Sequence, residues 1–407
     1  MPTLIKQQNQ LWTKAFICLF ILNFCQFISF HMQVSTFSFF IKSLGGSDMI
    51  AGLASGMFSI SALFARPFSG WLFDHTNKKK IFFIGVTGLI LLPLSYSLLK
   101  IIGLLVFLRI IHGAFWSLSS TAVNCEVVGI IPRHRFGEGM GYFGVTAALS
   151  MSISPALGLL LMNRFGFTSM FLLAAFMAVL ALFFTFVYGV KNTPHQLTIT
   201  KSPHKNLLQR LSSLFHKDAL PASVVLFFCL IPHGAIMTFV ALYAVANHIG
   251  SGSAFFVIMA LATIAVRLVI GKLSDTKGES GIVYTSCTCI FICMLLLGIF
   301  PGKIAFYIGA LFFGAGFGMI TPAMQAMALR IVPTENRGSA TSTYLCAFDL
   351  GIGLGGILGG ILVTTLGTYA HMYLCMLIAV VIAAGVYFFW SSKSPSAFQN
   401  AVKQQQA

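Results

Sequence analysis

The sequence is poor in charge, and poorest in acidic residues. Only 8% of its 407 residues are charged and only nine are Asp or Glu, whereas 57% are hydrophobic. A soluble domain usually carries charge on about 25–35% of its surface. This composition therefore excludes an ordinary water-soluble protein and predicts an integral membrane protein whose solvent is the lipid bilayer.

Motifs for ATP and for metals are missing as well. The chain contains no GxxxxGK[ST] loop and no long polar segment that could form an ATPase domain, so direct use of ATP is not expected. All nine cysteines lie in apolar runs without a His-Cys spacing typical of metal sites. We expect no enzymatic activity, no cofactor and no metal.

The apolar residues form runs of about 20 residues, the length that a helix needs to cross the ~30 Å hydrocarbon core. The first run is longer than the core of a secretory signal and lacks a small-residue cleavage site. We therefore interpret it as a first membrane helix. The expected runs are 15–40, 49–71, 81–99, 103–128, 138–162, 167–189, 221–245, 253–273, 281–300, 304–328, 338–364 and 369–391.

The net charge of +16 would suggest a nucleic-acid partner in a soluble protein, but its distribution along the chain indicates membrane orientation instead. If the first helix starts in the cytoplasm, 20 of the 25 basic residues lie inside, in accord with the positive-inside rule. The exceptions are Lys42, Lys100, Arg164 and Lys303 outside and Arg109 within the membrane. We expect a multi-pass protein of the inner (cytoplasmic) membrane with both termini cytoplasmic, and no nucleic-acid partner.

An offset of 201 residues relates the two halves of the chain. Because the offset covers six runs, an even number, both halves have the same orientation across the bilayer. We predict bundles at 1–190 and 220–407, joined by a cytoplasmic linker at 191–219 that carries a short amphipathic surface helix. The matched pairs are 66/267, 70/271, 72/273, 74/275, 113/314, 132/333, 137/338, 158/359 and 166/367.

The stretch GWLFDHTNKKK, residues 70–80, resembles the loop between helices 2 and 3 of the major facilitator superfamily. Gly70, Asp74 and the three lysines match that loop, whereas His75 replaces an arginine and Asn77 a glycine. Asn can adopt the left-handed turn that glycine favours there. The resemblance implies an all-α membrane fold of twelve helices, in two six-helix bundles around a central substrate cavity.

Asp74 ends a predicted helix, where the helix dipole disfavours a carboxylate. Its partner is either a basic loop residue, Arg133 or Arg135, or the amino-terminal end of a helix on the same face. We predict a cytoplasmic latch in which Asp74 meets the start of the run at 338–364 and Asp275 the start of the run at 138–162. The alternative is that these acids only balance nearby lysines. The predicted gating residues are Gly70, Asp74, Lys78, Lys79, Lys80, Arg135, Gly271, Asp275 and Arg337.

Seven of the nine acids belong to loops or helix ends, which leaves Glu126 and Asp349 for carboxylate-based proton coupling. In the run 103–128, a stripe at spacings of three and four shares one helix face; it comprises Arg109, His112, Trp116, Ser119 and Ser120, with Glu126 at its edge. RIIHG resembles the helix-4 motif of proton-driven members of the family. That resemblance gives Arg109 the role of tuning a neighbouring carboxyl or histidine. The alternative is a structural pairing with Asp349 or with backbone carbonyls.

Other polar residues at membrane depth either recognise substrate or hold helices together. Asp349 lies in a glycine-rich run that permits close helix packing, and a carboxyl buried there can take up a proton near neutral pH. For His31 and His233, a hydrogen-bonded structural role and a proton-carrying role are both open. The predicted cavity residues are Asn23, Gln26, His31, Gln33, Arg109, His112, Trp116, His233, Tyr243 and Gln325.

The run 138–162 resembles the exporter-associated motif of the family at Gly141, Pro155 and Gly158, and departs from it at Ser150, Ser154 and Leu159. We therefore predict proton-coupled efflux of small amphipathic or polar molecules, such as drugs or metabolites, by alternating access. The partners are a small-molecule substrate, protons and the lipid bilayer, and a monomer suffices. The alternatives are a proton-coupled importer of sugars, nucleosides or organic acids, and a non-transporting receptor or scaffold.

Overall fold

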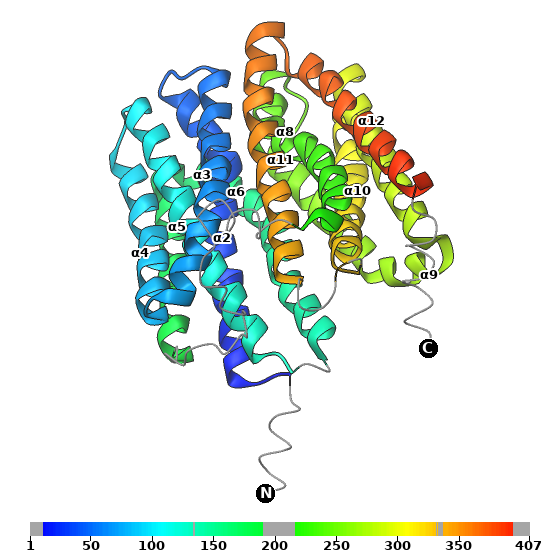
Figure 1. Cartoon of the computed structure of the whole chain (residues 1–407). Helices are drawn as coiled ribbons and strands as arrows, with labels where there is room; N and C mark the ends of the chain where they lie inside the picture. The colour runs from blue at the N-terminus through cyan, green and yellow to red at the C-terminus, as the bar shows by residue number, and fades with distance from the viewer. Residues whose placement is uncertain (1–10, 133–134, 190–215, 331, 333–336, 394–407) are drawn as a thin grey trace, which may run out of the picture. The chain divides into compact units, whose positions relative to one another are not determined.

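A computed structural model describes residues 11–132, 135–189, 216–330, 332 and 337–393. The described part is helical, with no strand (Figure 1), because in lipid the backbone must satisfy its own hydrogen bonds. The helices are α2 (Lys14–Ser43), α3 (Asp48–His75), α4 (Lys78–Leu98), α5 (Ile102–Ile130), α6 (Phe136–Tyr188), η2 (Lys217–Ala219), α8 (Leu220–Ala246), α9 (Gly252–Ile299), α10 (Lys303–Arg330), α11 (Arg337–Leu366) and α12 (Tyr369–Lys393).

All twelve predicted apolar runs lie in these helices. Within the described residues, ten helical segments are long and apolar enough to cross a membrane, and 252–267 forms a shorter apolar helix. Two helices each hold two runs, because α6 has 53 residues and α9 has 48, about 70–80 Å at 1.5 Å per residue. In α6 the backbone leaves helical geometry at Gly166 (φ 81°, ψ 176°), between the two predicted runs. The all-α membrane class is confirmed.

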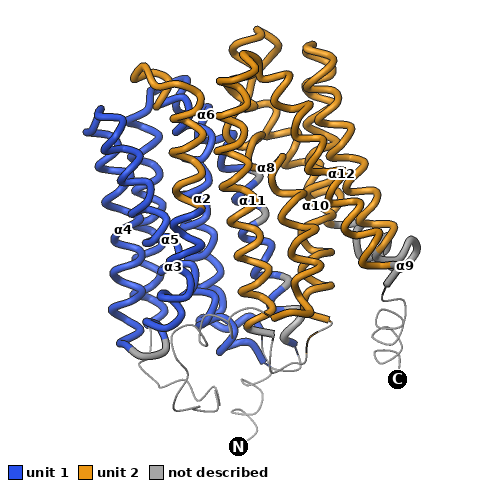
Figure 2. The backbone as a smooth tube through the Cα atoms, turned by 45° about the horizontal axis from the view of Figure 1, so that its top comes forward, with its two compact units in different colours: residues 1–40, 60–201 blue, residues 41–59, 202–407 orange. Residues whose placement is uncertain are grey.

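The chain divides into two compact units (Figure 2). Unit 1 comprises residues 1–40 and 60–201, and unit 2 comprises 41–59 and 202–407. The second unit therefore includes the turn between α2 and α3 and the first part of α3, a grouping that the predicted boundaries do not contain. Most of the predicted linker with its surface helix, 190–215, lies outside the described residues.

Two pairs of glycines at the 201-residue offset occupy equivalent places in the two units. Gly166 and Gly367 both have positive φ, 81° and 75°, which glycine adopts without a side-chain clash. A Cβ at Gly158 would lie 2.5 Å from the carbonyl oxygen of Met32 in α2, and one at Gly359 would lie 2.9 Å from the ring of Phe239 in α8. The duplication read from the sequence therefore reproduces local backbone structure and helix packing.

Glycines of α11 bring this helix against α8 in unit 2. A Cβ at Gly351 would lie 2.7 Å from the carbonyl oxygen of Phe227, and a Cβ at Gly355 would clash with the backbone carbonyl of Ile231. Small residues permit this close approach of the two backbones. In lipid, where the hydrophobic effect does not drive helices together, such close packing is a source of helix association.

Gly355→Ala is expected to destabilise the protein by about 1–3 kcal/mol, because the neighbouring atom is backbone and cannot rotate away. Gly144→Ala is the matched control, since Gly144 is also inside a helix and a Cβ there would meet nothing within 4 Å. The control is expected to be neutral or to gain up to about 1 kcal/mol from helix propensity. Thermal unfolding in detergent measures both, and equal melting temperatures for the two variants would contradict the packing argument.

Candidate functional site

Helix α5 carries most of the predicted polar residues of unit 1. The structure buries the stripe along this helix together with the acid at its end. The exposed fractions are 1% for Arg109, 0% for His112, 4% for Trp116, 0% for Ser119, 3% for Ser120 and 6% for Glu126.

A chain of hydrogen bonds joins α2, α5 and α6. Asn23 donates from Nδ2 to Thr146 Oγ1 (2.7 Å), and Gln26 donates from Nε2 to Asn23 Oδ1 (2.8 Å). Ser119 donates its hydroxyl to Gln26 Oε1 (2.7 Å). Both amides thus find their partners inside the bundle, so this geometry favours the helix-holding role over substrate recognition for Asn23 and Gln26.

Arg109 is held among aromatic rings. Its guanidinium lies 4.5 Å from the centroid of the Phe37 ring, a cation–π arrangement, and it interacts with the hydroxyl of Tyr96. That hydroxyl lies 3.2 Å from Nδ1 of His112. Tyr96 therefore links Arg109 and His112 of α5. Sequence reasoning missed Tyr96, because an aromatic residue near the end of an apolar run carries no distinguishing pattern.

A second aromatic group lies on α2 and α5. Trp116 packs against Phe27 (centroids 4.8 Å apart) and Phe30 (4.7 Å), and His31 packs against Phe30 (4.6 Å). These side chains form a largely buried aromatic cluster with one imidazole, and aromatic surroundings of this kind favour flat or amphipathic molecules.

Gln33 lies six residues after Phe27 on α2 and is fully buried. Its Nε2 donates to the carbonyl oxygen of Ser29 (2.8 Å), and its Oε1 has no hydrogen-bond partner among the described residues. Of the amides predicted on α2, Gln33 is therefore the one with an acceptor left for a bound molecule.

Glu126 lies in a buried ionic cluster at the ends of α4, α5 and α6. Lys78 Nζ donates to its Oε1 (3.0 Å) and the Tyr188 hydroxyl donates to its Oε2 (2.7 Å). Both side chains of the ion pair are only 8% exposed, and Nζ of Lys78 also lies 4.9 Å from the centroid of the Phe73 ring. A residue predicted for proton coupling and a lysine predicted for the gating loop are thus partners in one contact.

In unit 2, the predicted residues are dispersed. His233 is fully buried on α8 and stacks on Phe313 and Phe317 of α10 (centroids 5.7 and 4.1 Å). Neither ring nitrogen of His233 has a hydrogen-bond partner among the described residues. Tyr243 instead donates to the carbonyl oxygen of Leu297 in α9 (2.7 Å). Gln325 is half-buried on α10.

Asp349 is 9% exposed on α11, among the glycines of this helix. These glycines allow α11 to pack closely against two other helices within unit 2. Gly351 packs on α8, whereas a Cβ at Gly360 would lie 2.7 Å from the carbonyl oxygen of Asp48 in α3. The glycine run therefore supports a helix that is closely packed on two sides.

A polar cluster that the sequence did not reveal lies at one end of unit 2 and is centred on Asp48. Lys42 pairs with Asp48 Oδ2 (2.9 Å) and the Tyr369 hydroxyl donates to Asp48 Oδ1 (2.7 Å). Asp48 is one of the seven acids that the sequence analysis assigned to loops or helix ends. Its contact with Tyr369 could not be predicted there, because 321 residues separate the two. The charge distribution predicts that this contact lies on the outer side of the membrane.

The predicted latch falls largely outside what the structure describes, because the surroundings of Asp74, Gly271, Asp275 and Arg337 are not among the described residues. The same holds for Gly141 of the exporter-like motif. Asn77 is described, and it corrects one expectation. Its backbone is extended (φ −66°, ψ 110°) rather than left-handed, and its Oδ1 accepts from the backbone N–H of Lys79 and Lys80 (3.0 and 3.4 Å). Asn77 replaces glycine because it caps α4.

The remaining motif residues have defined places. A Cβ at Gly70 would meet nothing within 4 Å, and Arg135 is half-buried at the start of α6. Pro155 is buried inside α6. Gly158, about one turn later, lies where α6 meets Met32 of α2.

Comparison with known families settles what this arrangement of helices is. The model of the Major Facilitator Superfamily matches residues 19–320 and 285–407. The chain belongs to the Major Facilitator Superfamily. It is therefore a multi-pass secondary transporter and not an enzyme, and members of this family carry small-molecule substrates.

Relatives and solved structures agree with this membership. The chain is 23% identical to the staphylopine export protein of Staphylococcus aureus over 321 residues, 77% of this chain and 80% of that one. It is 24% identical to an uncharacterized transporter of the superfamily, YhhS of Escherichia coli, over 82% of each chain. A crystal structure of a POT family transporter with 5-aminolevulinic acid has a TM-score of 0.75 at 14% identity, covering 96% of this chain and 98% of that one. At this identity, the structural likeness shows the fold alone.

Proposed function

We propose that the chain is a proton-coupled exporter of small amphipathic or polar molecules that works by alternating access. The observation that carries the proposal is the buried cation Arg109, held by Phe37 and Tyr96 next to His112. A full charge at membrane depth costs several kcal/mol and is kept for function by default. The aromatic cluster around Trp116, on the same two helices, supports an amphipathic substrate.

Asp349 is our proposed proton carrier. The other intramembrane carboxylate, Glu126, has both oxygens engaged by Lys78 and Tyr188, which favours a structural role. Asp349 is buried on α11, a helix packed on two sides by glycine contacts. Protonation of a carboxylate at such a place changes the stability of the packed state, which is how a proton gradient biases one conformation over another.

Export rather than import is supported by the Gly141, Pro155 and Gly158 pattern in α6 and by the printed activity of the Staphylococcus aureus relative. Staphylopine is therefore the first substrate to test. The predicted orientation places both termini in the cytoplasm of a cell whose inner membrane holds the protein as a monomer.

Inside-out vesicles with an acidic lumen test the direction of transport. We expect labelled staphylopine, or a compound identified by comparing metabolites of cells with and without the gene, to accumulate in the lumen several-fold above vesicles without the gradient. Accumulation only in right-side-out vesicles with an acidic exterior would instead establish the importer. Gradient-independent uptake in both preparations would reject proton coupling.

The same vesicles test the carrier. Asp349→Asn is expected to abolish gradient-driven accumulation while leaving exchange of labelled for unlabelled substrate intact. Asp218→Asn, at a residue of η2 whose side chain is 58% exposed, is the matched control and should behave as wild type. Wild-type proton-coupled accumulation by Asp349→Asn would move the coupling role to another residue.

A further inference from the structure

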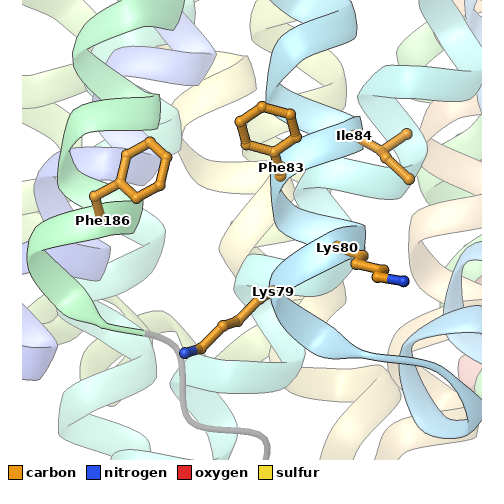
Figure 3. Close-up of a pocket in the computed structure, with 5 residues that line it drawn as sticks. All are labelled: Lys79, Lys80, Phe83, Ile84 and Phe186. Carbon is orange, nitrogen blue, oxygen red and sulfur yellow. The ribbon is translucent and has the colours of Figure 1, made fainter.

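A hollow of about 300 Å³ opens on the surface of unit 1, between the first turns of α4 and the last turns of α6. Its lining combines two cations with three apolar side chains: Lys79, Lys80, Phe83, Ile84 and Phe186. Figure 3 shows Phe186 reaching from α6 and Lys79 from α4 toward the same gap. The rings of Phe83 and Phe186 lie edge to face, with centroids 6.3 Å apart.

The two lysines of the hollow are free to bind an anion. Lys78, their neighbour, turns inward to Glu126, whereas Lys79 and Lys80 are exposed. Neither of these two has an acidic partner within the part of the chain that the structure describes. Their backbone N–H groups are occupied by Asn77. The attraction for an anion therefore comes from the two side-chain ammonium groups, and not from the end of the helix.

The apolar side of the hollow continues along both helices. Leu91 and Leu98 extend it on α4, and Phe183 and Phe176 extend it on α6, all of them exposed. From Phe83 to Leu91 the helix rises about 12 Å, close to the ~15 Å depth of one leaflet. An exposed face of this kind in a membrane protein is in contact with lipid tails.

We propose that this hollow binds an anionic glycerophospholipid. Its phosphate would sit at the ammonium group of Lys79, with Lys80 next to it on α4 adding positive charge, and one acyl chain would lie against Phe83 and Phe186. Charge complementarity selects the headgroup, since each lysine near a bilayer surface contributes about fivefold to the affinity for anionic lipid. On the predicted orientation, the hollow faces the cytoplasmic leaflet. This inference does not rest on the direction of transport or on its substrate.

Native mass spectrometry of the full chain released from nanodiscs tests the inference. The nanodiscs contain equal amounts of phosphatidylglycerol and phosphatidylcholine. Wild-type protein is expected to retain phosphatidylglycerol preferentially, and Lys79→Gln/Lys80→Gln is expected to reduce this preference by about tenfold or more. The control Lys14→Gln/Lys217→Gln removes the same charge at two exposed lysines outside the hollow and should keep the preference.

Phe186→Ala is a further variant for the same experiment, and it leaves every charge in place. It is expected to shorten the retention of phosphatidylglycerol at an unchanged headgroup preference, because the acyl chain loses one wall of the hollow. Equal preference in the two double variants would overturn the proposal, since the selectivity would then follow net charge alone. Equal retention of the two lipids by the wild type would overturn it as well, because the lipids would then be held by apolar contact alone.

Discussion

Glu126→Gln is expected to lower the free energy of unfolding by about 3 kcal/mol, although it changes only one side-chain atom. The substitution leaves the ammonium group of Lys78 buried without a counter-charge, since both side chains of the pair are only 8% exposed. Removing one partner of a buried ion pair typically costs about 3–5 kcal/mol, most of it from the charge left behind. Thermal unfolding in detergent micelles measures the loss as a lower melting temperature.

A double-mutant cycle separates the charge from the packing. Lys78→Met/Glu126→Gln removes both charges and is expected to recover most of the stability lost by Glu126→Gln, because an apolar side chain of similar length fills the place of the lysine. Lys79→Met is the matched control at the exposed neighbour and should change stability by no more than about 0.5 kcal/mol. If the double variant were as unstable as the single one, the contact would not act through charge.

The architecture was accessible from the sequence because lipid imposes a strong local rule. Each crossing needs about 20 apolar residues in helical form, so run lengths alone placed the helices. The duplication followed from glycines such as Gly166 and Gly367, whose positive φ excludes most other residues. Turn glycines keep their spacing in both halves, and the offset between them can be read from one sequence.

The partners of the polar residues were much less accessible. Helical spacing predicted that Arg109 and His112 share one face of α5, but it gives no information on the neighbouring helices. Tyr96 and Phe37, which complete their surroundings, lie on α4 and α2. The pairing of Lys78 with Glu126 spans 48 residues, and hydrophobic patterning carries no signal for such a pair. Those contacts depend on helix packing, which composition and periodicity do not specify.

The distinction between a residue that holds helices and one that serves transport also needed the structure. Asn23 and Gln26 were predicted for the cavity, yet each is satisfied by a neighbour in the bundle. Arg109 differs from these amides because it is a cation, and it contacts the ring of Phe37 and the hydroxyl of Tyr96. We therefore expect its charge to act on a neighbouring proton or substrate.

Arg109→Ala is accordingly expected to reduce gradient-driven transport by about a hundredfold, the scale on which loss of one preorganised hydrogen-bond donor slows an enzyme. Insertion into the membrane should persist, since a buried charge is expensive and its removal relieves that cost. The measurement is the initial rate of accumulation in inside-out vesicles, normalised to inserted protein. Arg164→Ala removes an exposed arginine and serves as the matched control.

Arg109→Lys distinguishes charge from shape at this position. Lysine keeps the positive charge but lacks the planar guanidinium of arginine. Only the guanidinium can contact the Phe37 ring and interact with the Tyr96 hydroxyl at the same time. We therefore expect it to recover only part of the activity lost by alanine. Full activity of Arg109→Lys would show that a positive charge alone is sufficient. Wild-type proton-coupled transport by Arg109→Ala would show that Arg109 has only a structural role. The proposed function would then rest on the aromatic cluster around Trp116.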